Sequence, residues 1–309
     1  MTNAVVLTDR GSGTTTFLGL LYCALVHAGS ALEDELRVHA SHGTLRALRG
    51  IYAEMMAGDF PSEANELPRD ELAFLLDFTS RSPSWRPFGH RPTEVKLEIA
   101  SLEAFADLRS HSYVSDTAVR ARVASQIALV LVDAGRLPSE PVTLEEGSGV
   151  MWSRFDSMVA RAFEILEAYH RLDRPRRRMP LQPVFILTKF DRLPSALRRL
   201  TRGGLVPSPT ATAARGTWLE AVLAPRLPRA WSSLRLEDGD SGFDSPVWFA
   251  SWVGLEERDP DAIRIRRRAG ARLGSWEVDY PQAEFEALLA LLHKLSSPIG
   301  DLAAASALG

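Results

Sequence analysis

Apolar positions along the chain form short runs separated by longer segments with helical spacing. Residues 127–132 and 184–187 are apolar throughout, which is typical of strands buried on both faces of a parallel sheet. Residues 4–7 and 247–250 are similar short runs and predict two further strands. In residues 95–99, apolar and charged residues alternate, which predicts a strand with one exposed face, at a sheet edge or beside an open site.

Apolar residues recur at helical spacing in residues 44–56, 151–172 and 285–295, and a long apolar stretch after Gly13 predicts a buried helix. Segments of mixed composition interrupt this alternation at about 30–93 and 192–245, and we interpret both as insertions. The second is rich in Pro, Gly, Ser and Arg. The pattern predicts a single α/β domain over residues 1–309, with a doubly wound, mostly parallel sheet and a site at the carboxyl ends of its strands.

Composition narrows the classes of function. The 309 residues are 45% hydrophobic and carry a formal net charge of −3, so no overall field attracts nucleic acid, which we do not expect as a partner. Cys23 is the single cysteine, which excludes a disulfide framework within one chain. The first residues contain neither a signal-peptide core nor an apolar stretch long enough for a membrane span, so we expect a cytoplasmic protein without membrane contact.

Residues 8–15, TDRGSGTT, follow the first predicted strand and open the first predicted helix, which is the position of a P-loop. In a P-loop, backbone N–H groups and a lysine surround phosphates, and a Ser or Thr hydroxyl holds Mg²⁺. Thr14 stands at the lysine position and Thr15 keeps the hydroxyl for the metal. Ordinary helix capping is the alternative interpretation of these residues. The candidate phosphate-binding residues are Arg10, Gly11, Ser12, Gly13, Thr14, Thr15 and Thr16.

Thr188-Lys-Phe-Asp191 follows another buried strand and resembles the [Asn/Thr]-Lys-x-Asp motif of P-loop GTPases. In that family the aspartate accepts two hydrogen bonds from guanine, and the lysine stem packs along the base. Ser251-Trp-Val-Gly254 ends the last predicted strand and is similar to the Ser-Ala-x-Gly loop that completes the guanine pocket. Trp252 replaces a small residue there, and an aromatic residue at a sheet edge is its alternative interpretation. The resemblance implies guanine binding by Thr188, Lys189, Asp191, Ser251 and Trp252.

Other GTPase motifs are altered. Ile99 and Leu102 occupy the positions of the Asp and Gly of Asp-x-x-Gly, and only Glu103 remains. Ala64 stands where the family has a switch threonine. Asp133-Ala-Gly135 could substitute for the Asp-x-x-Gly motif. The order of the strands favours the other interpretation, that Asp133 ends the strand at residues 127–132. These departures affect the γ-phosphate and metal end of the nucleotide, so weak or absent GTP hydrolysis is implied and no catalytic residue is assigned.

The overall pattern, over residues 5–295, resembles a degenerate TRAFAC-class P-loop GTPase domain and, within that class, the bacterial double-GTPase family. This resemblance implies a Ras-like fold with helical and loop insertions, GTP or GDP with Mg²⁺ as the cofactor, and a protein partner such as a second GTPase. The leading hypothesis is a pseudo-GTPase that regulates or binds its partner in a conflict, defence or signalling system. The alternatives are an active GTPase in which Glu103 or Asp133 takes over the metal and Arg10 supplies charge, and a nucleotide-free scaffold.

Overall fold

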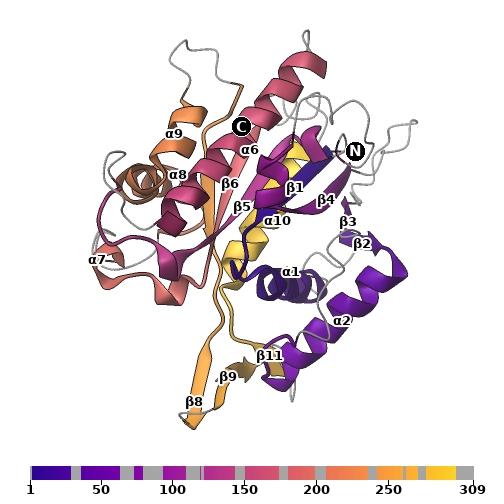
Figure 1. Cartoon of the computed structure of the whole chain (residues 1–309). Coiled ribbons are helices and arrows are strands. Elements are labelled where there is room, and N and C mark those ends of the chain that lie inside the picture. The colour runs from indigo at the N-terminus through magenta and orange to yellow at the C-terminus, as the bar shows by residue number, and fades with distance from the viewer. Residues whose placement is uncertain are drawn as a thin grey trace, which may run out of the picture.

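The structure is a computed structural model in which a seven-stranded sheet forms the centre of the chain (Figure 1). It describes residues 2–28, 36–62, 73–78, 93–108, 119, 122–142, 150–173, 180–198, 207–235, 242–259, 262–270 and 276–296. In spatial order the strands are β2 (Leu36–Ala40), β3 (Ala73–Phe78), β4 (Thr93–Ser101), β1 (Thr2–Thr8), β5 (Ile127–Asp133), β6 (Gln182–Thr188) and β7 (Val247–Ala250). The five strands from β4 to β7 are parallel, whereas β2 and β3 pair antiparallel. The predicted α/β class and mostly parallel sheet are confirmed.

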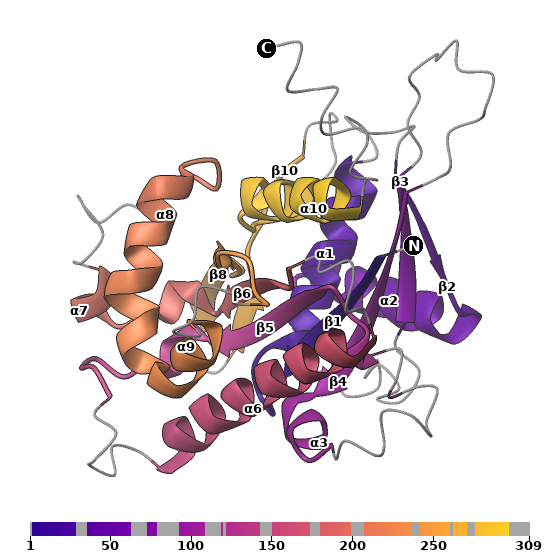
Figure 2. The same ribbon diagram turned by 90° about the horizontal axis from the view of Figure 1, so that it is seen from above.

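Helices cover both faces of the sheet, as Figure 2 shows from above. One face packs against α1 (Thr14–Ala28), α2 (His42–Ala57) and α10 (Gln282–Ser296), and the other against α3 (Leu102–Ala106), α6 (Val150–Asp173), α8 (Thr212–Trp218) and α9 (Pro228–Leu234). Alternate residues of each strand enter opposite layers because side chains alternate along a strand. Val5 and Leu7 belong to the α6 side, and Ala4 and Val6 to the α1 side.

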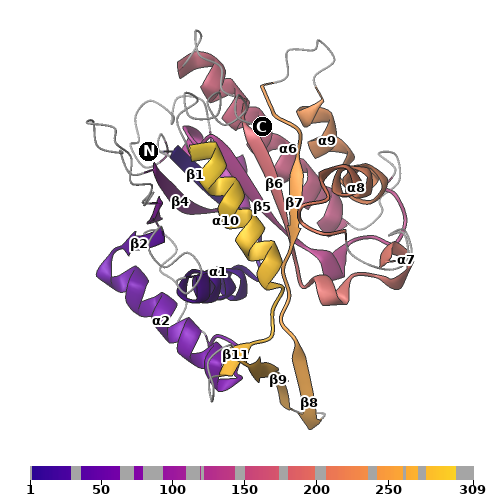
Figure 3. The same ribbon diagram turned by 180° about the vertical axis from the view of Figure 1, so that it is seen from behind.

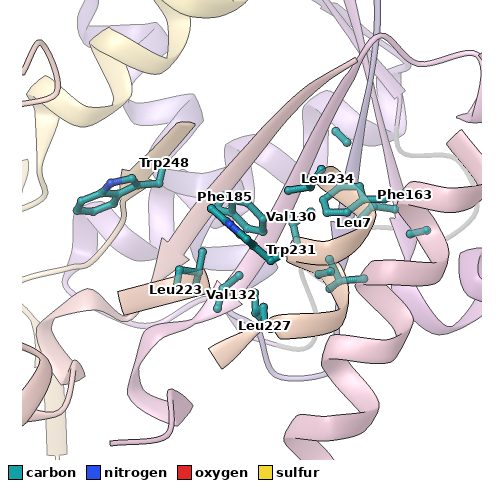
Figure 4. Packing of buried hydrophobic residues seen from close by; sticks show 14 of the residues in the cluster. Leu7, Val130, Val132, Phe163, Phe185, Leu223, Leu227, Trp231, Leu234 and Trp248 are labelled. Atoms are coloured by element: carbon teal, nitrogen blue, oxygen red, sulfur yellow. The ribbon is translucent and has the colours of Figure 1, made fainter. Parts of the chain in front are cut away.

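The layer on the α6 side contains the larger aromatic cluster (Figure 4). Phe163 of α6 packs edge-on against Phe185 of β6, with ring centroids 6.3 Å apart. Trp231 of α9 stacks on the same Phe185, also at 6.3 Å. The sheet is therefore apolar on both faces, which explains the uninterrupted apolar runs of β5 and β6.

The position of β4 corrects one prediction. The alternation in residues 95–99 predicted an edge strand or one beside an open site, but β4 lies inside the sheet, between β1 and β3. Its polar residues Lys96 and Glu98 form an ion pair on one face, and Glu98 is buried. The edge-strand alternative was wrong, because β3 and β2, from within the presumed insertion at 30–93, extend the sheet beyond β4.

The segment 192–245 is more helical than predicted. Only one helix near 217–223 was expected, whereas the structure has α7 (Ser195–Arg198), α8, a π-helical turn (Leu219–Leu223), a 3-10 turn (Ala224–Arg226) and α9. Pro228 begins α9, where its fixed φ suits the first helical turn. These helices are too short for a clear periodicity, and they are held by buried aromatic residues such as Trp218 and Trp231.

After β7 the chain forms two antiparallel pairs, β8 (Leu255–Asp259) with β9 (Ala262–Ile265) and β10 (Arg267–Ala269) with β11 (Trp276–Val278). Figure 3 shows β8 and β9 projecting away from the main sheet. The backbone N–H of Ile265 donates to the carbonyl of Gly58, the residue that ends α2. The projecting pair is thus joined to the end of α2.

The outer edge of β7 is covered by a buried ion pair between Arg215 of α8 and Glu284 of α10. Arg215 Nη1 donates to the carbonyl of Trp248 at 2.6 Å, and Glu284 Oε2 accepts from the N–H of Ala250 at 3.0 Å. These two bonds satisfy edge groups that a terminal strand otherwise leaves unpaired. The pair therefore closes this end of the sheet and connects helices from its two faces.

No helix in the described part of the chain is long and apolar enough to cross a membrane.

Cys23 provides a test of the packing of α1. Its side chain is fully buried, and burial raises the pKa of the thiol to about 12. We expect the native protein to react very slowly with Ellman's reagent at pH 8, because the reactive thiolate is scarce and shielded. One equivalent of thiol should then react rapidly in denaturant, which absorbance at 412 nm measures. Fast reaction of the native protein would contradict the burial of this helix face.

Candidate functional site

The loop between β1 and α1 has the form of an anion-binding turn. Gly11 and Gly13 have φ values of 76° and 80°, in the left-handed region that glycine adopts without strain. The N–H of Ser12 donates to the carbonyl of Asp9 at 3.1 Å, and the N–H of Phe17 donates to that of Gly13 at 2.9 Å. The turn therefore leads directly into the N-terminus of a 15-residue helix, where backbone N–H groups favour an anion.

Position 14, the lysine position of the resemblance, carries a neutral side chain in this turn. The Thr14 hydroxyl lies 3.1 Å from that of Ser12, so this position supplies a neutral hydrogen-bonding group. Arg10 is exposed on the same loop, and its guanidinium makes no hydrogen bond or ion pair with the described residues. Arg10 is thus the available positive charge in this turn.

Lys189 joins the guanine motif to the loop. It follows β6 and has a φ of 49°, the only positive value at a non-glycine residue in the described ranges. Its Nζ donates to the carbonyl of Gly11 at 2.8 Å and to Asp133 Oδ2 at 2.7 Å. Beside it, Thr188 Oγ1 donates to the carbonyl of Ser12 at 2.6 Å. The ends of β1, β5 and β6 are therefore held together by polar contacts.

Asp133 is the centre of these contacts, a role that its sequence position alone did not indicate. Its other oxygen, Oδ1, accepts from the N–H of Gly135 at 3.0 Å, and Arg136 Nε lies 3.4 Å from Oδ2. The side chain is only 8% exposed. Asp133 is the last residue of β5, in agreement with its interpretation as the end of a strand. Its carboxylate already has one backbone donor and two cationic partners.

A pocket of about 90 Å³ lies where the predicted guanine residues meet. It is lined by Gly13, Thr16, Phe17, Phe60, Thr188, Lys189, Asp191, Arg192, Ser251, Trp252, Val253 and Leu255. All five predicted guanine-binding residues are among them, together with two of the predicted phosphate-binding loop. Asp191 is exposed and available for hydrogen bonding. The structure therefore brings four separated segments of the sequence into one concave site.

The two loops that carry the predicted guanine-binding residues are joined to each other by backbone hydrogen bonds. The N–H of Ser251 donates to the carbonyl of Leu187 at 2.8 Å, and the N–H of Phe190 donates to that of Ser251 at 3.2 Å. Trp252 both lines the pocket and packs on Phe190, with ring centroids 6.2 Å apart. Trp252 thus lines the pocket and also packs as an aromatic residue near the sheet edge.

Phe60 is a pocket residue that sequence reasoning missed. It lies two residues after Gly58, whose φ of 92° ends α2, and its side chain is 41% exposed. An aromatic residue between Asp59 and Pro61 in a polar segment was the available signal. Its flat ring offers a surface for a planar ligand.

Fewer of the GTPase motif residues are present where the resemblance places the metal and the γ-phosphate. Ile99 is buried at the end of β4, and Glu103 forms an ion pair with Arg154 of α6. Within the described residues, no group of three or more His, Cys, Asp and Glu side chains is placed to hold a metal ion. Thr15 stands half-buried in the first turn of α1, and Ala64 lies outside the described residues. The candidate oxygen ligands for Mg²⁺ considered from the sequence are thus the Thr15 hydroxyl and two carboxylates, Glu103 and Asp133, that already have cationic partners.

Replacing Lys189 with methionine tests the link between the loops. The change leaves Asp133 and the Gly11 carbonyl without their ammonium partner, so we expect the free energy of unfolding to fall by about 1–3 kcal/mol. Urea denaturation followed by circular dichroism measures this change. Arg192→Met, at an exposed neighbouring position, serves as the control and should leave the midpoint almost unchanged. Equal midpoints for the two variants would contradict the structural role of Lys189.

No protein-family model matches this sequence, and a search of the curated proteins finds no significant match. The assignment of the site therefore depends on its residues and their geometry.

Proposed function

We propose that this chain is a GTPase-like protein that binds guanine nucleotide weakly, hydrolyses it poorly and acts through a protein partner. A second GTPase in a cytoplasmic multi-component system is the partner that the sequence resemblance favours. The observation that carries this proposal is the convergence of the β1–α1 loop, Thr188–Asp191 and the Ser251 loop on one pocket. The Ras-like fold belongs to the same proposal, and it is supported by a central β1 that is followed directly by the glycine turn and α1.

The chemistry of the pocket favours guanine over adenine. Guanine presents two neighbouring donors, N1–H and the 2-amino group, and the exposed carboxylate of Asp191 accepts both. Lys189 is held beside this position by Gly11 and Asp133, so its aliphatic stem can pack along a base. Charged hydrogen bonds in a partly enclosed site give strong discrimination, because a wrong base leaves them unmade.

Poor hydrolysis is expected from the residues that would surround the phosphates and the metal. Phosphoryl transfer depends on positioned charges around the phosphates, and Mg²⁺ supplies part of that charge in GTPases. Here the lysine position is Thr14, and the two carboxylates considered as replacement metal ligands are already engaged, Glu103 by Arg154 and Asp133 by Lys189. These contacts favour nucleotide binding over a rearranged active GTPase.

Calorimetric titration of the purified chain with GDP, GTP and ADP, each with Mg²⁺ and with a chelator, tests the proposal. We expect weak, guanine-selective binding and a phosphate release rate from GTP close to the background. Magnesium-dependent turnover would favour the active GTPase instead. Absence of binding at millimolar GDP and GTP would leave the nucleotide-free scaffold as the better explanation.

Introducing a lysine at position 14 should restore the missing cation. Thr14→Lys places an ammonium group in the glycine turn, and we expect GDP affinity to rise by about tenfold, since charge-assisted hydrogen bonds to phosphate are about twice as strong as neutral ones. Thr14→Met has a similar length without the charge and should not give this gain. Calorimetry measures both variants, and equal affinities would argue against phosphate binding in this turn.

A further inference from the structure

A larger cavity, distinct from the guanine pocket, opens between the β1–α1 loop, the end of β5 and the start of α6. Its volume is about 600 Å³, which is in the range of small-molecule sites. It is lined by Asp9, Arg10, Ser12, Leu131, Asp133, Arg136, Pro138, Met151, Trp152 and Phe155. Of these, Arg10 and Ser12 were predicted to bind phosphate and Asp133 was an alternative metal ligand, and none was predicted to face an apolar cavity.

The apolar wall of the cavity is held in place by partly buried hydrogen bonds. Trp152 Nε1 donates to the carbonyl of Arg226 at 2.6 Å, and Arg226 Nε donates to that of Pro138 at 2.5 Å. Arg226 is only 2% exposed, and Phe155 packs against Trp152 with ring centroids 5.1 Å apart. Because these side chains are fixed, the wall is preformed and a ligand need not order it.

The opposite side of the cavity is charged, with two arginines, Arg10 and Arg136, and the carboxylates of Asp9 and Asp133. Arg10 has no side-chain partner within the described residues, as noted above. Arg136 has only long contacts, at 3.4 Å from Nε to Asp133 and 3.5 Å from Nη1 to the carbonyl of Arg10. Both guanidinium groups therefore keep donors for a ligand. Asp133 adds little opposing charge because Lys189 also pairs with it.

Met151 adds an exposed apolar surface next to these cations. Its side chain is 74% exposed in the first turn of α6, the most exposed large hydrophobic side chain in the described ranges. A flexible thioether at such a position suits ligands of variable shape. The cavity thus combines a fixed aromatic wall, an adaptable apolar residue and two available guanidinium groups.

We propose that this cavity binds an amphipathic anion, a small molecule with an aromatic or aliphatic body and a single carboxylate, sulfonate or phosphate head. The body packs against Trp152, Phe155 and Met151, and the head is bound by Arg10 and Arg136. The cavity shares no lining residue with the guanine pocket, but Arg10 and Ser12 also belong to the predicted phosphate-binding loop, so binding is measured without nucleotide.

Fluorescence titration with 8-anilinonaphthalene-1-sulfonate, in the absence of nucleotide, tests the inference. This probe carries an aromatic body and one sulfonate. We expect saturable binding of one probe per chain. Met151→Glu should weaken it by about tenfold or more through charge repulsion and lost contact, whereas Met151→Leu should retain it. Arg136→Gln should also weaken it. Both positions are exposed, and circular dichroism verifies that each variant is folded.

An exposed tryptophan beside an arginine, away from the cavity, provides the matched control for probe binding. Arg267 lies over the ring of Trp276, at 5.8 Å from its centroid, and this tryptophan is 58% exposed. Trp276→Ala should therefore leave probe binding unchanged. Probe loss in Trp276→Ala, or unchanged affinity in Met151→Glu, would overturn the assignment to the cavity.

Displacement with surfactant-like ligands, each below its micellar concentration, tests the preference for an anion. Dodecanoate should displace the bound probe, whereas dodecyltrimethylammonium, with the same chain and opposite charge, should not. Equal displacement by the two compounds would overturn the role given to the two arginines.

Discussion

Glu284→Ala is expected to lower the free energy of unfolding by about 3–5 kcal/mol, because it leaves the buried guanidinium of Arg215 without its counter-charge. Both side chains of the pair are less than a tenth exposed. The change also removes the acceptor for the N–H of Ala250 at the edge of β7. Urea denaturation, monitored by circular dichroism and tryptophan fluorescence together, measures the effect.

The matched control is Glu220→Ala, which removes the partner of Arg235 in an exposed ion pair on the same side of the protein. Exposed pairs contribute at most about 1 kcal/mol, so this variant should unfold close to the wild type. A joint replacement, Arg215→Met with Glu284→Leu, should be more stable than Glu284→Ala because it leaves no unpaired charge. Similar losses for Glu284→Ala and Glu220→Ala would show that the buried pair is not important for stability.

Asp191→Asn is expected to switch the base preference of the guanine pocket from guanine to xanthine. Guanine offers two donors to the carboxylate, whereas an asparagine amide offers one acceptor and one donor. Xanthine, with N1–H and a 2-oxo group, matches the amide. We expect GDP affinity to fall by roughly 100-fold and xanthosine diphosphate to become the better ligand, because charged hydrogen bonds are worth about 1.5–3 kcal/mol each.

An exchange of preference also separates recognition from misfolding, since an unfolded variant binds neither base. Asp59→Asn, at another exposed carboxylate in the loop next to Phe60, is the control and should keep the preference for GDP. Calorimetry with both diphosphates measures the ratio of affinities. A parallel loss of both ligands in folded Asp191→Asn, or an unchanged preference for GDP, would be evidence against the proposed contact with Asp191.

The strands that form the site could be predicted because their side chains enter apolar layers on both faces. The uninterrupted apolar runs of β5 and β6 are a direct result of this double burial. Polar residues at the ends of such strands then have to meet at one edge of the sheet, and the contact of Thr188 with Ser12 is an example. The predicted grouping of the phosphate-loop and guanine residues at that edge was therefore accessible from sequence.

The remaining features depend on contacts that periodicity does not encode. β3 is apolar, but its sequence AFLLDF lies in a segment rich in Pro, Ser and charge, which concealed it. The Arg215–Glu284 pair joins residues 69 positions apart, and neither residue belongs to a motif. Phe60 enters the pocket only because α2 ends at Gly58 and directs the chain there. Such features require the tertiary structure.

The central place of β1 has a consequence for how the protein is made. β1 is synthesised before both of its neighbours in the sheet, β4 and β5, which end at Ser101 and Asp133. At a synthesis rate of about 5–20 residues per second, β1 waits roughly 6–25 s for its second partner. Until then the apolar run of β1 lacks its sheet partners, so early folding of the chain has to shelter this segment by other contacts.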